Sequence, residues 1–201
     1  MKIDMDAIVR VTETWDQTEG LVKRSEILSE AMAVPAISEL RYAGRKLIDY
    51  LRALVTGASQ ESLEMHLAEF EQNVFRARHD ALDGIIITIR EVITLQELRS
   101  GIKVITKILP WYPEFRETIT EIEGKIIYSR SHRLERADTY GDIIKAYNID
   151  DILTKFAELR SSEALLSIER DSYSRNLRIT RYSVLFGILM AVITLSVIII
   201  K

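Results

Sequence analysis

Residues 182–200 read YSVLFGILMAVITLSVIII and contain no charged side chain. As a helix with a rise of about 1.5 Å per residue, this stretch is roughly 28 Å long, close to the roughly 30 Å hydrocarbon thickness of a bilayer. A helix buried in a protein core is the alternative for an apolar run, but such runs are typically about 10 to 14 residues long. The stretch therefore predicts a C-terminal transmembrane anchor over residues 181–201, preceded by a helical domain over residues 1–180.

Basic residues flank this stretch unequally, with three before it and one after it: Arg175, Arg178, Arg181 and Lys201. Lysine and arginine accumulate on the cytoplasmic side of membrane spans, so we expect residues 1–180 in the cytoplasm. Residues 1–20 lack the apolar stretch of a signal peptide. The chain is thus predicted to be a tail-anchored, single-pass protein of the cell inner membrane.

Composition excludes several functional classes. The 201 residues include no cysteine, which rules out disulfides, thiolate zinc sites and a cysteine nucleophile. Charged residues make up 28% of the chain with a net charge of −3, so there is no overall attraction to nucleic acid. An anionic ligand would need a local basic cluster. We expect no cofactor and no metal site.

Apolar residues recur at spacings of three and four along most of the chain, and strand-like alternation is not sustained. The predicted fold is therefore all-α, a bundle of long helices. The clearest apolar stripe runs along the third segment: Leu63, Leu67, Phe70, Val74, Ala77 and Ala81. We expect helices over residues 4–32, 35–55, 60–109, 115–137 and from about 151 into the anchor. The 60–109 segment is either one helix or is broken near Gly84 or Gly101.

The last apolar stripe leads into the predicted anchor without an intervening proline or glycine. Its members are Ile152, Phe156, Leu159, Leu166, Tyr173 and Leu177. We therefore expect the last cytosolic helix to continue into the span. A helical junction, unlike a flexible linker, couples tilt or rotation of the body to the membrane segment.

Small residues mark one face of the predicted anchor: Ser183, Gly187, Ala191 and Thr194. Such residues let membrane helices approach closely, and serine or threonine adds interhelical hydrogen bonds. The face predicts self-association into a homo-oligomer, or a narrow polar lining within a ring of subunits. The alternative is a plain anchor. No charged residue lies within the stretch, so no charge ring for ion selectivity is encoded.

Basic clusters on three predicted helices are candidates for an anion-binding site: Arg41, Arg45, Arg76, Arg78, His79, Arg130, Arg133 and Arg136. Arginine forks bind phosphates, and nearby tyrosines can stack on bases. The alternative for each cluster is a solvated helix face with salt bridges at i,i+4 spacing. The cluster of Arg76, His79, Asp80 and Asp83 is the leading candidate, because it lies close to the apolar stripe. Its partner could be Glu39 or Arg41 as readily as a ligand.

Enzyme signatures are weak. The Glu-x-x-His motif of di-iron bundles and the His-Glu-x-x-His motif of zinc proteases are both absent. The His79-Asp80 pair resembles the core of helical HD phosphohydrolases, without their wider ligand spacing. Arg76-Ala77-Arg78-His79 resembles the motif of HEPN ribonucleases, with too short a gap. We expect no catalytic residues, and a membrane-held enzyme is the third functional hypothesis.

In its layout, the chain resembles single-span membrane effectors of bacterial anti-phage defence systems. The resemblance implies that a nucleotide or oligonucleotide signal acts on the cytosolic domain of an oligomer, whose membrane helices then gate an ion channel or permeabilise the membrane. The alternative is a membrane-tethered adaptor or scaffold that binds a partner protein through an apolar helical seam such as residues 40–54.

Overall fold

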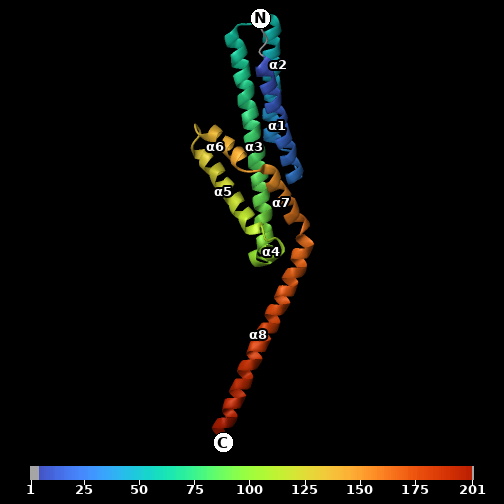
Figure 1. Ribbon diagram of the computed structural model, residues 1–201, viewed down its shortest axis with the longest axis vertical. Coiled ribbons are helices and arrows are strands. Elements are labelled where there is room, and N and C mark those ends of the chain that lie inside the picture. Colours follow the sequence, from blue (N-terminus) through green and yellow to red (C-terminus); the bar gives the residue numbers. More distant parts are fainter. Residues whose placement is uncertain (1–4, 201) are drawn as a thin grey trace. The chain divides into compact units, whose positions relative to one another are not determined.

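The computed structural model describes the backbone of residues 5–200 and the side chains of residues 8–188. Within this range the chain forms eight helices and no strand, which confirms the all-α prediction. The helices are α1 (Met5–Ser29), α2 (Val34–Thr56), α3 (Gln60–Ser100), α4 (Ile102–Ile108), α5 (Tyr112–Ser131), α6 (Arg136–Ala146), α7 (Ile149–Ser161) and α8 (Glu163–Ile200). Figure 1 shows their order along the chain.

The chain divides into two compact units. Unit 1 consists of Met1–Glu91 and Thr118–Ile149, and unit 2 consists of Val92–Glu117 and Asp150–Lys201. Helices α3 and α5 contribute to both units, because a unit boundary falls inside each of them. The predicted boundary between a domain over residues 1–180 and an anchor stays a prediction.

In unit 1, α1, α2 and the first part of α3 lie side by side (Figure 1) and bury the predicted stripe of α3. Phe70 is fully buried and stacks on Trp15 of α1 with their ring centroids 6.3 Å apart. Ala77 and Ala81 pack with residues of α1 and α2. Apolar periodicity therefore identified the buried face of α3. Not every apolar residue of these helices is buried, since Ile27 of α1 is 77% exposed.

Two glycines follow the ends of helices with a positive backbone φ, which other residues rarely adopt. Gly57 has a φ of +68° and terminates α2, with its N–H bonded to the carbonyls of the last turn. Gly101 has a φ of +78° and separates α3 from α4, so the 60–109 segment breaks there. Gly84 lies within α3, and a Cβ at this position would approach Ser25 Oγ to 2.8 Å. This glycine permits the close approach of α1 to α3.

The predicted fourth helix is shorter than expected. It was predicted to continue to Ala137, but α5 ends at Ser131 and the chain turns before α6 begins at Arg136. No proline or glycine lies in this turn. The turn allows α6 to bury Tyr140 and Ile143, which are 1% and 0% exposed. Tertiary burial thus outweighs the helical propensity of the segment.

Unit 2 contains the end of α3, the short helix α4 and the helices α7 and α8. The chain breaks at Ser162, where a single final helix was expected, and Ser162 donates a hydrogen bond from Oγ to the Glu158 carbonyl at 2.8 Å. Beyond this break, α8 runs uninterrupted from Glu163 to Ile200 (Figure 1). Among the residues that the structure describes, no helix combines the length and apolarity needed to cross a membrane. Residues 189–200 of the predicted anchor lie outside the described side chains.

Candidate functional site

The leading candidate cluster of the sequence, around His79, is a buried polar cluster in unit 1. His79 lies on α3 and is only 2% exposed. Its ring stacks on Tyr140 of α6 with the centroids 3.7 Å apart, and it meets Phe75 edge-on at the same distance. Aromatic rings therefore cover the imidazole, which is not open to a soluble ligand in this arrangement.

Asp83 lies one turn beyond His79 and links three helices. It accepts a hydrogen bond from the Tyr140 hydroxyl of α6. Its other carboxylate oxygen pairs with an Nη atom of Arg130 of α5 at 3.1 Å. Burial, together with the adjacent Asp83 carboxylate, raises the pKa of Tyr140 to about 12. Tyr140 therefore stays protonated, as a hydrogen-bond donor must.

His79 is held uncharged. Burial, and after it the positive charges of Arg136 and Arg78, lower its pKa to about 3. Its Nε2 atom has no hydrogen-bond partner among the described residues. At neutral pH the imidazole therefore carries no positive charge with which to bind an anion, and its role here is packing between Phe75 and Tyr140.

Carboxylates gather beside His79. Burial raises the pKa of Asp80, and the negative charges of Asp83 and Glu39 raise it further, while Arg136 opposes this shift. The Asp80 carboxylate is therefore protonated more readily in the folded chain than it would be in water. No group of three or more histidine or acidic side chains within the described residues is arranged to hold a metal ion.

Four of the eight predicted anion-binding residues contribute to this region, and the others do not. Arg130 and Arg136 contact Asp83 and Tyr140, whereas Arg78 reaches Thr18 of α1 at 3.3 Å. Three of the remaining arginines are exposed, and no contact among the described residues joins them to the cluster: Arg41, Arg76 and Arg133. The predicted residues therefore do not form one pocket.

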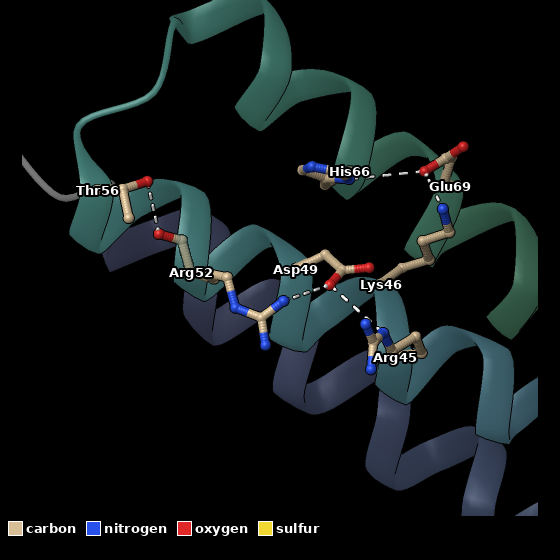
Figure 2. Close-up of polar contacts among 7 residues, drawn as sticks. All are labelled: Arg45, Lys46, Asp49, Arg52, Thr56, His66 and Glu69. Carbon is tan, nitrogen blue, oxygen red and sulfur yellow. Dashed lines mark hydrogen bonds and ion pairs between the residues drawn. The ribbon is translucent and has the colours of Figure 1, made fainter.

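The basic residues of α2 form a ladder of ion pairs (Figure 2). Arg45 pairs with Asp49 across one helical turn at 3.4 Å, and Arg52 approaches the same carboxylate at 3.5 Å. Lys46 reaches across to Glu69 of α3 at 2.7 Å and holds the pKa of this carboxyl below its ordinary value. This matches the alternative interpretation of the α2 cluster, a helix face with salt bridges.

Sequence reasoning named Glu39 or Arg41 as protein partners for the α3 cluster and missed Tyr140 and Arg130. Both were noted only as members of a separate cluster on the fourth helix. The spacing of Tyr140 and Ile143, an i,i+3 apolar pair after the charged 130–138 segment, could have indicated a separate short helix. That helix brings Tyr140 onto α3.

Two grooves lie on the described part of the chain, one in each unit. In unit 1, an apolar groove of about 130 Å³ lies between α1, α2 and α3, lined by Ile8, Val11, Thr12, Leu47, Tyr50, Leu51 and Leu67. In unit 2, a larger and more open groove of about 690 Å³ lies between the end of α3, α4 and α8. Its lining mixes apolar, basic and other polar side chains, including Leu98, Ile102, Lys103 and Leu177.

The hydrogen bond from Tyr140 to Asp83 gives a stability prediction. Replacing Tyr140 with phenylalanine should lower the free energy of unfolding by about 2 kcal/mol, because a buried bond to a charged acceptor is lost. The matched control is Tyr128→Phe, which removes an exposed bond from Tyr128 to Glu135 at 3.1 Å. Urea unfolding of the two variants measures the difference. Equal losses would contradict the role assigned to Asp83.

The predicted association face of the anchor is only partly within the described region. Ser183 and Gly187 are exposed on α8, and no other residue within the described part of the chain lies within 4 Å of a Cβ built at Gly187. Ala191 and Thr194 lie outside the described side chains. Self-association through this face stays a prediction.

Comparisons of the chain with protein-family models, with curated proteins and with solved structures find no match.

Proposed function

We propose that residues 182–200 anchor this chain in a membrane as an oligomer, and that the helical body transmits a signal to the anchor, which gates or permeabilises the bilayer. The observation that carries the proposal is the continuity of α8, which extends from Glu163 to Ile200 without a break. A continuous helix transmits displacement, whereas a flexible linker would absorb it.

The first turns of α8 are fixed within unit 2. Glu163 pairs with Arg99 of α3 at 2.6 Å, and Glu169 pairs with Lys107 of α4 at 2.5 Å. Leu166 lies between them in the sequence and is fully buried. A movement of α3 or α4 would therefore move the first turns of α8, and the continuous helix would carry the movement toward the anchor.

For the signal we propose an anionic ligand such as a nucleotide or oligonucleotide, as the likeness in layout to anti-phage effectors implies. The exposed arginines are the candidate contacts, because their charges have no carboxylate partner among the described residues: Arg41, Arg76 and Arg133. Arg45 is a weaker candidate, because Asp49 already balances its charge.

The first test is the mass of the full-length protein in detergent and its effect on liposomes. We expect a defined oligomer, and release of an encapsulated dye from liposomes that contain it. A monomer would overturn gating, because a single uncharged helix cannot enclose a pore. Replacing residues 182–200 with polyleucine should keep the protein in the membrane and abolish dye release.

Coupling through α8 is tested by two insertions of seven residues after Arg178. A helical insertion rotates the following residues by only about 20° from their original face, since an α-helix has about 3.6 residues per turn. It should preserve dye release. A glycine-serine insertion of the same length should abolish dye release, because it interrupts the helix. Equal dye release from both variants would contradict mechanical coupling.

The second candidate is a membrane-tethered adaptor, and the apolar groove of unit 1 favours it. Large apolar side chains on the same helices are exposed: Val9, Ile48, Leu51, Val55 and Met65. An amphipathic helix of a partner protein could lay its apolar face into such a groove. The polyleucine replacement separates the two candidates, because an adaptor needs only an anchor and would keep its partner.

A further inference from the structure

Unit 2 carries a surface on which positive charges outnumber negative charges. It is formed by residues 98–111, at the end of α3 and through α4, and by residues 172–188 of α8. Each segment contains three basic residues and no acidic residue: Arg99, Lys103 and Lys107 in the first, and Arg175, Arg178 and Arg181 in the second. Helices α4 and α8 pack against each other (Figure 1), and Lys103 lines one groove with Tyr173, Ser174 and Leu177, so the two segments join in one surface at this groove. We call it the cationic surface.

Most of this charge is not balanced within the protein. Arg99 and Lys107 pair with Glu163 and Glu169 near the start of α8. The other four cations are exposed and have no carboxylate partner among the described residues: Lys103, Arg175, Arg178 and Arg181. By contrast, three basic residues of α2 are matched by Asp49 and Glu69: Arg45, Lys46 and Arg52. The cationic surface is therefore suited to an anionic partner outside the chain.

Apolar side chains are interleaved with these cations. Leu98 is 80% exposed, and Ile102, Tyr173 and Leu177 are each more than two-fifths exposed. All four line the 690 Å³ groove, together with Lys103 and the carboxylate of Glu97, whose charge is balanced by Arg116 at 2.6 Å. Exposed apolar groups next to basic side chains are typical of surfaces at the membrane interface, where cations meet phosphates and apolar groups meet acyl chains.

The position of the groove along α8 agrees with lipid binding. This step rests on the proposed function, in which the bilayer core begins near Tyr182. Leu177 precedes Tyr182 by five residues, which is about 7.5 Å of helical rise, and Tyr173 precedes it by about 13.5 Å. The headgroup layer on each side of the hydrocarbon core is about 5 to 7 Å thick. The groove would thus open at or just above the headgroups.

We propose that the cationic surface binds the headgroups of anionic phospholipids, with Lys103 and Arg178 contacting the phosphate and the groove receiving the adjoining apolar part of the lipid. Because α4 and α8 both contribute, a bound lipid contacts the helix that leads into the anchor and the short helix packed against it. Membrane composition would then influence the coupling described above.

The test uses the full-length protein in a non-ionic detergent, titrated with short-chain phosphatidylglycerol or with phosphatidylcholine of the same chain length. We expect phosphatidylglycerol to bind at least tenfold more tightly, and the preference to decline as salt increases. Each of Lys103→Gln and Arg178→Gln should weaken binding about fivefold, since one cation near an anionic surface contributes about that factor. The matched controls are Arg10→Gln and Lys145→Gln, exposed cations of unit 1 outside the proposed ligand contacts, which should change binding less than twofold.

Three outcomes would overturn the lipid assignment: equal affinity for the two lipids, no effect of the two glutamine variants, or binding of polyglutamate or inorganic phosphate as tight as that of phosphatidylglycerol. Alkaline carbonate extraction of membranes distinguishes failure of the lipid inference from failure of the proposed anchor. If carbonate releases the chain, the proposed anchor fails. If the chain resists carbonate and shows no lipid preference, only the lipid inference fails.

Discussion

Replacing His79 with phenylalanine should remove most of the acid sensitivity of this protein. The pKa of His79 is lowered from 6.5 to about 3 in the folded chain, first by burial and then by Arg136 and Arg78. Between these two values the unfolded chain binds a proton that the folded chain does not, so folding stability falls as the pH falls. From pH 7 to pH 4 the loss amounts to about 3 kcal/mol.

Phenylalanine preserves the aromatic packing against Phe75 and Tyr140 and removes the titrating group. The variant should therefore lose much less stability at pH 4, as measured by urea unfolding at both pH values. Asp80 contributes with the opposite sign, because its raised pKa makes the folded chain bind a proton more readily as the pH falls. The matched control is His132→Phe, which removes an exposed imidazole from the turn after α5; an equal change in both variants would contradict the assignment to His79. If the free energy of unfolding of His79→Phe kept the same pH dependence, that result would contradict the buried, uncharged state of His79.

Replacing Phe70 with alanine should destabilise unit 1 by about 3 to 5 kcal/mol, the largest loss expected from a single substitution considered for this chain. Phe70 is fully buried, packs with Val74 of α3, Val11 of α1 and Ala43 of α2, and stacks on Trp15. Alanine would leave a cavity between three helices, and the surrounding backbone could close it only in part.

The matched control for Phe70 is Met65→Ala on the same helix. Met65 is 51% exposed, so its truncation should change the free energy of unfolding by less than about 0.5 kcal/mol. Urea unfolding of both variants gives the comparison. A small effect at Phe70 would indicate that the α1, α2 and α3 interface repacks readily, which would weaken the case for a preformed apolar groove.

The elements that the sequence predicted well are those with strong local determinants. The α3 stripe is set by a repeated apolar spacing, and all its members except the half-buried Leu67 are fully buried. Pro110 lies between α4 and α5, and Pro113 lies in the first turn of α5, where proline is tolerated because it disfavours only the helical interior. Gly57 and Gly101 end helices for a reason that is also local, their positive φ angles. The choice between one unbroken helix over 60–109 and a break near Gly84 or Gly101 required the structure.

The candidate site was predicted less well, because its partners are distant in sequence. The cluster on α3 was identified from its own residues, but its contacts come from α5 and α6, about 50 to 60 residues further along the chain. The turn between Ser131 and Arg136 allows these contacts to form, and it contains no glycine or proline. The break at Ser162 likewise contains no glycine or proline, and the Ser162 hydroxyl donates a hydrogen bond to the carbonyl of Glu158 in the preceding turn.

By itself, the sequence determined the all-α class, the apolar face of the long third helix, the glycine and proline ends of helices, and the absence of cysteine chemistry. These follow from local properties: side-chain periodicity, backbone restriction and composition. Only the tertiary structure decided that His79 is buried and uncharged, that Asp83 joins α3, α5 and α6, and that Lys103 shares a surface with α8. Such properties depend on which helices pack against each other. That packing is determined by burial between residues distant in sequence, which no short stretch of sequence encodes.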